Sequence, residues 1–157
     1  MVLSIKDNIL LFKVSNMSIK LQELSNDTTI VKHYIKDLSF EAPHLNPIDP
    51  LSSSSRFDAE FKVNVTPIEE NRFEVCLSLT GKGINGESEE TIYIIEVIQA
   101  GVFLINGDID EESMKEITLT QCPVNLFPYL REVVDSILAK SGFPPLRLAG
   151  IDFNTGK

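Results

Sequence analysis

One amphipathic helix in the C-terminal third of the chain constrains the fold more than any other feature. From Asn125 to Ser141, apolar residues recur at three- and four-residue spacing, which places them on one helix face: Leu126, Leu130, Val133, Val134, Ile137 and Leu138. Asn125 is the expected N-cap, with Pro128 in the first turn, and Gly142 is the expected stop. A stripe this wide needs a partner surface, which the residues upstream must supply.

The upstream residues predict β-strands. Thr28–Glu41 is rich in β-branched and aromatic residues. Phe57–Val65 and Phe73–Thr80 alternate apolar and polar residues, which is typical of strands with one buried and one solvated face. Glu90–Gln99 is different, because residues of both parities are apolar. Together these segments predict an antiparallel sheet.

The strand at 90–99 raises a question about its outer face. If Tyr93, Ile95 and Val97 face the core, three isoleucines are left outside beside a glutamate: Ile92, Ile94 and Ile98, with Glu96. A solvated face does not normally gather apolar residues in this way. Two explanations remain open, a terminal segment that covers them or a patch that binds a partner.

Strands followed by helices predict an α+β fold, a four-stranded antiparallel meander covered by one long helix and short helical segments. Gly81-Lys82-Gly83 is interpreted as a hairpin loop between strands. The acidic run 108–112 is interpreted as the N-cap and first turn of a short helix that continues to Ile117. Because one helix covers only part of such a sheet, self-association is expected.

Composition excludes several functions. The chain has 157 residues, which fits one domain, and its net charge of −9 disfavours nucleic acid as a partner. It contains no apolar run of the roughly 20 residues needed to insert into a membrane. Two cysteines without a CxxC pair favour a reduced, cytoplasmic setting, and two histidines without ligand spacing predict no metal. Since catalytic motifs are also missing, we expect a protein that is not an enzyme and needs no cofactor.

The first 27 residues are expected to be a flexible N-terminal extension. Met17 offers a second start, so residues 1–16 are interpreted as dispensable. The alternative is an amphipathic helix that continues through Leu24. Residues 28–153 then form the domain, and residues 154–157 a short C-terminal end.

Three motifs carry a specific resemblance. IKDLSFEAP spans Ile35–Pro43, EVIQAGVF spans Glu96–Phe103, and CPVNLFPYLREVVDSILAKSGFPPLRLAGIDF spans Cys122–Phe153. In this order and spacing they resemble the SecB family of bacterial protein-export chaperones, over residues 28–153. The resemblance implies a cytoplasmic homotetramer, a dimer of dimers in which helices lie between two eight-stranded sheets. It also implies ATP-independent binding of unfolded precursor proteins and their delivery to the SecA ATPase.

The resemblance also assigns sites. A SecA-binding face is implied at Asp37, Glu41, Ile94 and Glu96, which strand parity places on the outer side of the sheet. A precursor-binding groove is expected at Phe57, Ala59 and Phe61, with Phe143 and Leu146 across from them, although Phe61 could equally be core. The assembly and helix-packing surface is implied at Ile95, Val97 and Gln99, with Val133 and Ile137 on the helix.

An alternative function keeps the same fold. The chain could be a SecB-like regulatory module dedicated to one partner, of the toxin–antitoxin type. The chain stops at Asn154–Lys157, where family members usually continue into a second helix and an acidic tail. This short end favours the alternative slightly. Binding of one partner but not of diverse unfolded precursors would distinguish it.

Overall fold

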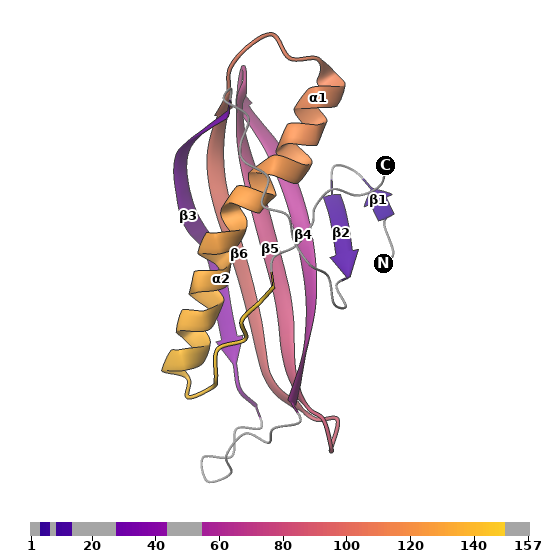
Figure 1. Ribbon diagram of the computed structural model, residues 1–157, viewed down its shortest axis with the longest axis vertical. Coiled ribbons are helices and arrows are strands. Elements are labelled where there is room, and N and C mark those ends of the chain that lie inside the picture. The colour runs from indigo at the N-terminus through magenta and orange to yellow at the C-terminus, as the bar shows by residue number, and fades with distance from the viewer. Residues whose placement is uncertain (1–3, 7–8, 14–27, 44–54, 150–157) are drawn as a thin grey trace.

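One face of a long antiparallel sheet carries all the helical structure of the described chain (Figure 1). The computed structural model describes residues 4–6, 9–13, 28–43 and 55–149. The sheet order is β1-β2-β4-β5-β6-β3. The strands are β1 Ser4–Lys6, β2 Ile9–Lys13, β3 Thr28–Glu41, β4 Ser55–Glu69, β5 Arg72–Asn85 and β6 Thr91–Ile105. The predicted four-stranded sheet is therefore present as β3 to β6, with two further strands beyond β4.

The order of the four main strands is not the predicted meander. β4, β5 and β6 follow one another as hairpins, but β3 lies beside β6, three strand positions away from its successor β4. The sheet therefore has a Greek-key order. The connection from Ala42 to Ser54 has 13 residues, which can span about 40 Å, whereas three strand spacings measure only about 14 Å. This long, proline-rich connection makes the crossing possible.

β5 and β6 are longer than the sequence pattern indicated. Gly81-Lys82-Gly83 lies inside β5 and pairs with β6, so its interpretation as a hairpin loop is wrong. The turn comes later, where the Asn85 side chain accepts hydrogen bonds from the backbone N–H groups of Glu87 and Ser88. Glycine inside a strand marks a close approach by a neighbour, and aromatic rings supply that neighbour in this sheet.

The helical layer is one continuous rod made of α1 (Glu111–Glu116), a π-helical turn η1 (Ile117–Gln121) and α2 (Cys122–Lys140). The acidic run starts α1 as predicted, because the Asp110 carboxylate accepts a hydrogen bond of 2.9 Å from the Ser113 N–H. Gly142 ends α2 with a φ of +82°.

The predicted start of the long helix is wrong. Asn125 is not an N-cap, because α2 already begins at Cys122 and the Asn125 amide donates to the Gln121 carbonyl. Pro128 therefore lies inside the helix rather than in its first turn. An internal proline loses one helical hydrogen bond. Here the residues on either side, Phe127 and Leu130 among them, are buried against the sheet, which holds the helix in place.

β1 and β2 lie in the segment for which no fixed structure was expected before about Asp27. They form a hairpin, and β2 pairs antiparallel with β4 from Ile9↔Asn64 to Lys13↔Glu60. The alternative of an amphipathic helix fails over Ile9–Lys13, since these residues are a strand. Met17 and Leu24 lie outside the described residues.

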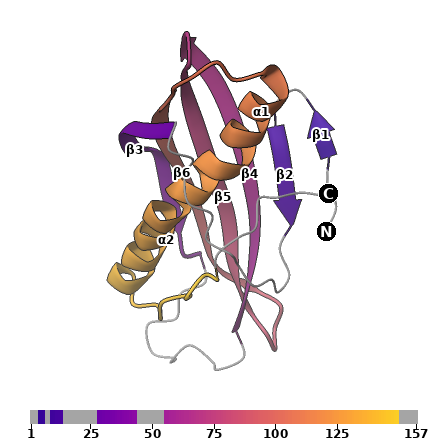
Figure 2. The same ribbon diagram turned by 45° about the horizontal axis from the view of Figure 1, so that its top comes forward.

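The core lies between the helical rod and the sheet, and Figure 2 shows both helices on this same face. Alternate residues of β5 and β6 are fully buried there, among them Leu77, Leu79 and Ile95. Ile92 is also buried, so its predicted outward position is wrong: a bulge opposite Gly83/Ile84 shifts the register and draws this side chain into the core. Within the described residues, no helix is long and apolar enough to cross a membrane.

Candidate functional site

A layer of aromatic rings crosses the helix-side face of the sheet next to the end of α2. Tyr93 of β6 is at its centre, with ring centroids 4.6 Å from Phe143, 5.9 Å from Phe40 and 6.3 Å from Phe57. Phe40 and Phe143 are themselves 6.1 Å apart, edge to face. The layer thus joins β3, β4 and β6 to the segment after α2. Aromatic pairs at these distances attract one another beyond simple burial.

Two glycines of β5 make room for this layer. A Cβ atom on Gly83 would lie 2.3 Å from the Tyr93 ring, and one on Gly81 would lie 2.3 Å from the Phe57 ring. Both contacts are far shorter than van der Waals distance, so the rings lie directly on the β5 backbone. This explains the two glycines inside a strand: they let aromatic side chains of the neighbouring strands lie flat.

The predicted groove residues divide into exposed and core positions. Phe57, Ala59 and Leu146 are half-buried and pack against the hydrophobic core. Phe61 is only 2% exposed and its ring lies 6.1 Å from that of Phe127 in α2, which fits the core alternative. Phe143 is buried beneath the same surface. The residues that remain accessible are therefore Phe57, Ala59 and Leu146.

Tyr93 and Phe40 are the two members of the aromatic layer that sequence reasoning did not assign to the groove. Strand parity placed Tyr93 correctly on the core face, but its contacts with three other rings required the tertiary structure. Burial raises the pKa of Tyr93 to about 12, so the phenol stays neutral. The spacing of Gly81, Gly83 and the aromatic residues on both neighbouring strands was the available signal.

The segment after α2 is held over the sheet by a side chain of the helix. The Leu146 N–H donates a hydrogen bond of 3.2 Å to the Asp135 carboxylate. Phe143 anchors the start of the segment on Tyr93. Between these two points the chain runs through Pro144 and Pro145, both exposed. The segment is thus fixed at two places, by Phe143 on Tyr93 and by Leu146 on Asp135.

The outer face of the sheet brings together the four residues assigned to SecA binding. Glu41 pairs with Ile94 and Ser39 with Glu96, while Asp37 is opposite Ile98. The Ser39 hydroxyl lies 3.4 Å from the Glu96 carboxylate. Asp37, Glu41 and Glu96 are exposed, and Ile94 and Ile98 are partly exposed. The predicted parity is correct for these residues. Whether a terminal segment covers the isoleucines lies outside the described residues.

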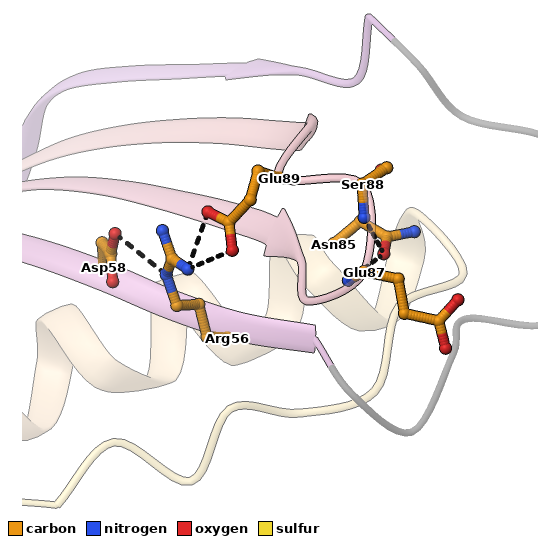
Figure 3. A network of polar contacts seen from close by, with 6 residues as sticks. All are labelled: Arg56, Asp58, Asn85, Glu87, Ser88 and Glu89. Atoms are coloured by element: carbon orange, nitrogen blue, oxygen red, sulfur yellow. Dashed lines mark hydrogen bonds and ion pairs between the residues drawn. The ribbon is translucent and has the colours of Figure 1, made fainter.

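Charged residues of β4 and the β5–β6 turn extend this outer face. In register, Asp58 is opposite Lys82, which is opposite Ile94. Arg56 Nη1 lies 2.8 Å from both carboxylate oxygens of Glu89, and Arg56 Nε lies 3.5 Å from Asp58 (Figure 3). The Arg56–Glu89 pair ties β4 to a turn in which Glu89 adopts a φ of 58°.

A second polar cluster lies farther along the outer face. The Glu74 carboxylate accepts hydrogen bonds from the Tyr34 hydroxyl and from Lys36 Nζ, the latter at 2.6 Å. Hydrogen bonds from Lys36 and Tyr34 lower the pKa of the Glu74 carboxyl. Lys36 is at a bulge of β3, between Ile35 and Asp37, which lets it reach across β6 to β5. The cluster links the edge strand to the middle of the sheet.

The free edge at β3 exposes apolar side chains next to an uncovered part of α2. Val31, Ile35 and Leu38 are 53%, 47% and 37% exposed. On α2, Tyr129, Val133 and Ile137 recur every four residues and are exposed or half-buried. The His33 ring stacks on Tyr129 at 3.9 Å, so the strand edge and the helix stripe form one continuous surface. Ordinary monomers seldom leave such a surface open.

The remaining assembly residues lie beneath the helix. Ile95 and Val97 are buried in the core, and Gln99 is 2% exposed. The side-chain N–H of Gln99 donates a hydrogen bond of 3.1 Å to the Tyr34 carbonyl oxygen. The side-chain oxygen of Gln99 has no hydrogen-bond partner within the described residues. All three are thus buried residues of the sheet. In the part of the chain that the structure describes, no three His, Cys, Asp or Glu residues are grouped as a metal site would require.

Comparison with known proteins identifies the family. The family described as preprotein translocase subunit SecB matches residues 21–155. The protein-export protein SecB of Nitrosococcus oceani is 41% identical over 129 residues, 80% of this chain and 76% of that protein. The protein of the same name from Methylococcus capsulatus is 38% identical over 139 residues, 88% of this chain and 87% of that protein.

A solved structure supports the fold independently. It is a SecB-like chaperone of Mycobacterium tuberculosis in complex with a peptide from an antitoxin. The TM-score is 0.66 at 21% identity, and the match covers 80% of this chain and 91% of that one.

Proposed function

We propose that this chain, which belongs to the SecB family of protein-export chaperones, binds unfolded precursor proteins in the cytoplasm and delivers them to SecA without using ATP. The proposal rests above all on the aromatic layer around Tyr93, together with the half-buried apolar residues Phe57, Ala59 and Leu146. Apolar burial is non-directional, so one such surface accepts many different sequences. Unfolded proteins share exposed apolar segments and little else.

The apolar edge and helix stripe favour self-association into a homotetramer. A second copy that pairs with the β3 edge would cover Val31, Ile35 and Leu38 and extend the sheet across the dimer. The stripe of Tyr129, Val133 and Ile137 would then face a second dimer, with helices between two sheets.

The outer face is the proposed SecA-binding surface. Asp37, Glu41 and Glu96 surround the partly exposed Ile94, which combines negative charge with apolar contact area. Acidic groups increase the association rate with a basic partner, while the isoleucine gives contact area once the partner is bound. Because helices lie on the opposite face, precursor and SecA could bind at the same time.

The proposed function is tested with a permanently unfolded client, reduced and carboxymethylated α-lactalbumin. We expect the chain to run as a tetramer by native mass measurement and to bind this client without nucleotide. Phe57→Ala should weaken client binding about tenfold, because it removes an accessible ring from the apolar surface. Asp58→Ala is the matched control, since its side chain belongs to the opposite face and should leave client binding unchanged.

Two results would contradict the proposal. A stable monomer that binds no unfolded protein would exclude a chaperone of this type. Tight binding of one folded partner, with no affinity for unfolded clients of different sequence, would instead favour the dedicated regulatory module.

A further inference from the structure

The β1–β2 hairpin extends the sheet beyond β4, on the side opposite the β3 edge. β2 adds to β4 as an antiparallel strand, with Leu11 opposite Lys62 and Phe12 opposite Phe61. The hairpin precedes residues 21–155, the segment that matches the SecB family, so it is an addition to the family domain. It pairs with only five residues of the 15-residue strand β4.

The sequence of β2 is apolar over most of its length. Ile9–Lys13 reads ILLFK, four consecutive apolar residues followed by a basic one. Segments of this kind are buried in folded proteins and exposed in unfolded ones. The β4 residues opposite them, 60–64, directly continue Phe57 and Ala59 of the proposed client surface. An extended client segment on that surface would therefore reach the same strand edge.

We propose that the β4 edge at Glu60–Asn64 binds an extended apolar segment of the client as an added strand, and that β2 occupies this edge as an internal competitor. This inference rests on the proposed chaperone function and gives it a binding mode. Backbone pairing supplies affinity that does not depend on sequence, which suits a protein with many clients. The hairpin lowers the apparent affinity by the fraction of molecules in which the edge is taken.

The register also indicates a preference among clients. Lys13 is paired with Glu60, so a basic residue at the end of an apolar run stands across from an acid. Glu60 is exposed, and Nζ of Lys62 in the same strand lies 3.8 Å from its carboxylate. Opposite charges at directly paired strand positions favour pairing modestly. Segments that carry a basic residue after the apolar run should therefore bind best.

A reversible disulfide tests the competition in the full chain. Leu11→Cys with Lys62→Cys joins two residues that are opposite in register, and Lys62 is exposed, so the core is spared. The native thiols of Cys76 and Cys122 are buried and do not compete; burial raises the pKa of Cys122 to about 12. Lys62→Cys alone is the control, and Ile9→Cys with Asn64→Cys is a second lock.

The probe is the peptide NILLFKV, which copies residues 8–14. The reduced lock should bind it at least about tenfold more tightly than the oxidised lock, and Leu10→Pro/Leu11→Pro should bind it more tightly than the unaltered chain. Both prolines are needed because alternate residues of a strand direct their N–H groups to opposite neighbours. Replacing the peptide lysine with glutamate should weaken binding about two- to fivefold.

Backbone N-methylation separates strand pairing from simple apolar contact. Two peptides are compared, one N-methylated at the odd positions and the other at the even positions. In only one of them do the methylated nitrogens face β4, so only that peptide should lose binding. Equal loss from both, or equal binding to the locked and reduced protein, would overturn the strand-addition proposal. If carboxymethylated α-lactalbumin still binds in both redox states, the chaperone function stands without it. If that client binds to neither, the proposed function itself is wrong.

Discussion

The two faces of the sheet are formed by the same strands, but one face is buried under the helices and the other is exposed. In β6, Ile95 is fully buried under α2, whereas its neighbour Ile94 is partly exposed on the other side. On the helix side, aromatic rings pack directly against the β5 backbone, Tyr93 at Gly83 and Phe57 at Gly81. The outer face holds exposed carboxylates and ion pairs that reach solvent. A substitution should therefore change stability on one face and partner binding on the other.

The largest difference is expected between the two adjacent isoleucines. Ile95→Ala should lower the free energy of unfolding by about 3–4 kcal/mol, because it leaves a cavity in a packed core. Ile94→Ala should cost about 1 kcal/mol or less, since the site is already open to solvent. Urea unfolding of both variants measures the difference. Equal losses would mean that the outer face is also packed, for instance by another part of the chain.

The glycine pair should show a smaller, graded effect. Gly83→Ala should cost about 2 kcal/mol, because the new methyl group meets the buried Tyr93 ring. Gly81→Ala should cost about 1 kcal/mol, since the half-buried Phe57 ring can move outward. Thermal unfolding gives the stabilities, and client binding gives a second measurement: Gly81→Ala should alter it through Phe57. If Gly81→Ala lowers the stability more than Gly83→Ala does, the Phe57 ring is the more constrained of the two rings.

On the outer face, Glu74 should contribute about 1 kcal/mol in a pH-dependent way. Its pKa is lowered in the folded state from 4.5, so its stabilising effect is present above the unfolded pKa and is lost as the pH falls through the folded value. Glu74→Gln should therefore be less stable than the unaltered chain at pH 7, and the difference should shrink below about pH 4.

Glu96→Gln is the control for this pH series, because Glu96 is exposed on the same face. Its stability should follow that of the unaltered chain at each pH. If the loss of stability in Glu74→Gln stays constant down to pH 3, Glu74 does not stabilise the fold through its charge.

The smallest stability change is expected for Glu96→Lys, within about 0.5 kcal/mol, because the side chain is solvated. The tetramer should stay intact, while SecA binding should weaken about tenfold at low salt through charge reversal. Glu69→Lys makes the same charge change at an exposed site at the end of β4 and should leave SecA binding unchanged. Loss of the tetramer in Glu96→Lys would contradict the assignment of Glu96 to the outer face.

The sequence by itself determined the strand at Thr28–Glu41, the stop at Gly142 and the helix start in the acidic run 108–112, because each depends on neighbours a few residues away. Alternation also placed Asp37, Glu41 and Glu96 on one face correctly. The three family motifs supplied the fold class and the export function. Local periodicity and motif spacing are properties of the chain itself, so they can be recovered without coordinates.

Only the tertiary structure decided the features that depend on distant parts of the chain. The bulge that buries Ile92 follows from a register shift against β5. Gly81 and Gly83 belong to a strand because they pair with β4 and β6, whose aromatic rings lie on them. The position of β3 beside β6, and of β2 on β4, depends on which strand edges remain free once the sheet forms. Such pairings join residues far apart in sequence, and no local pattern records them.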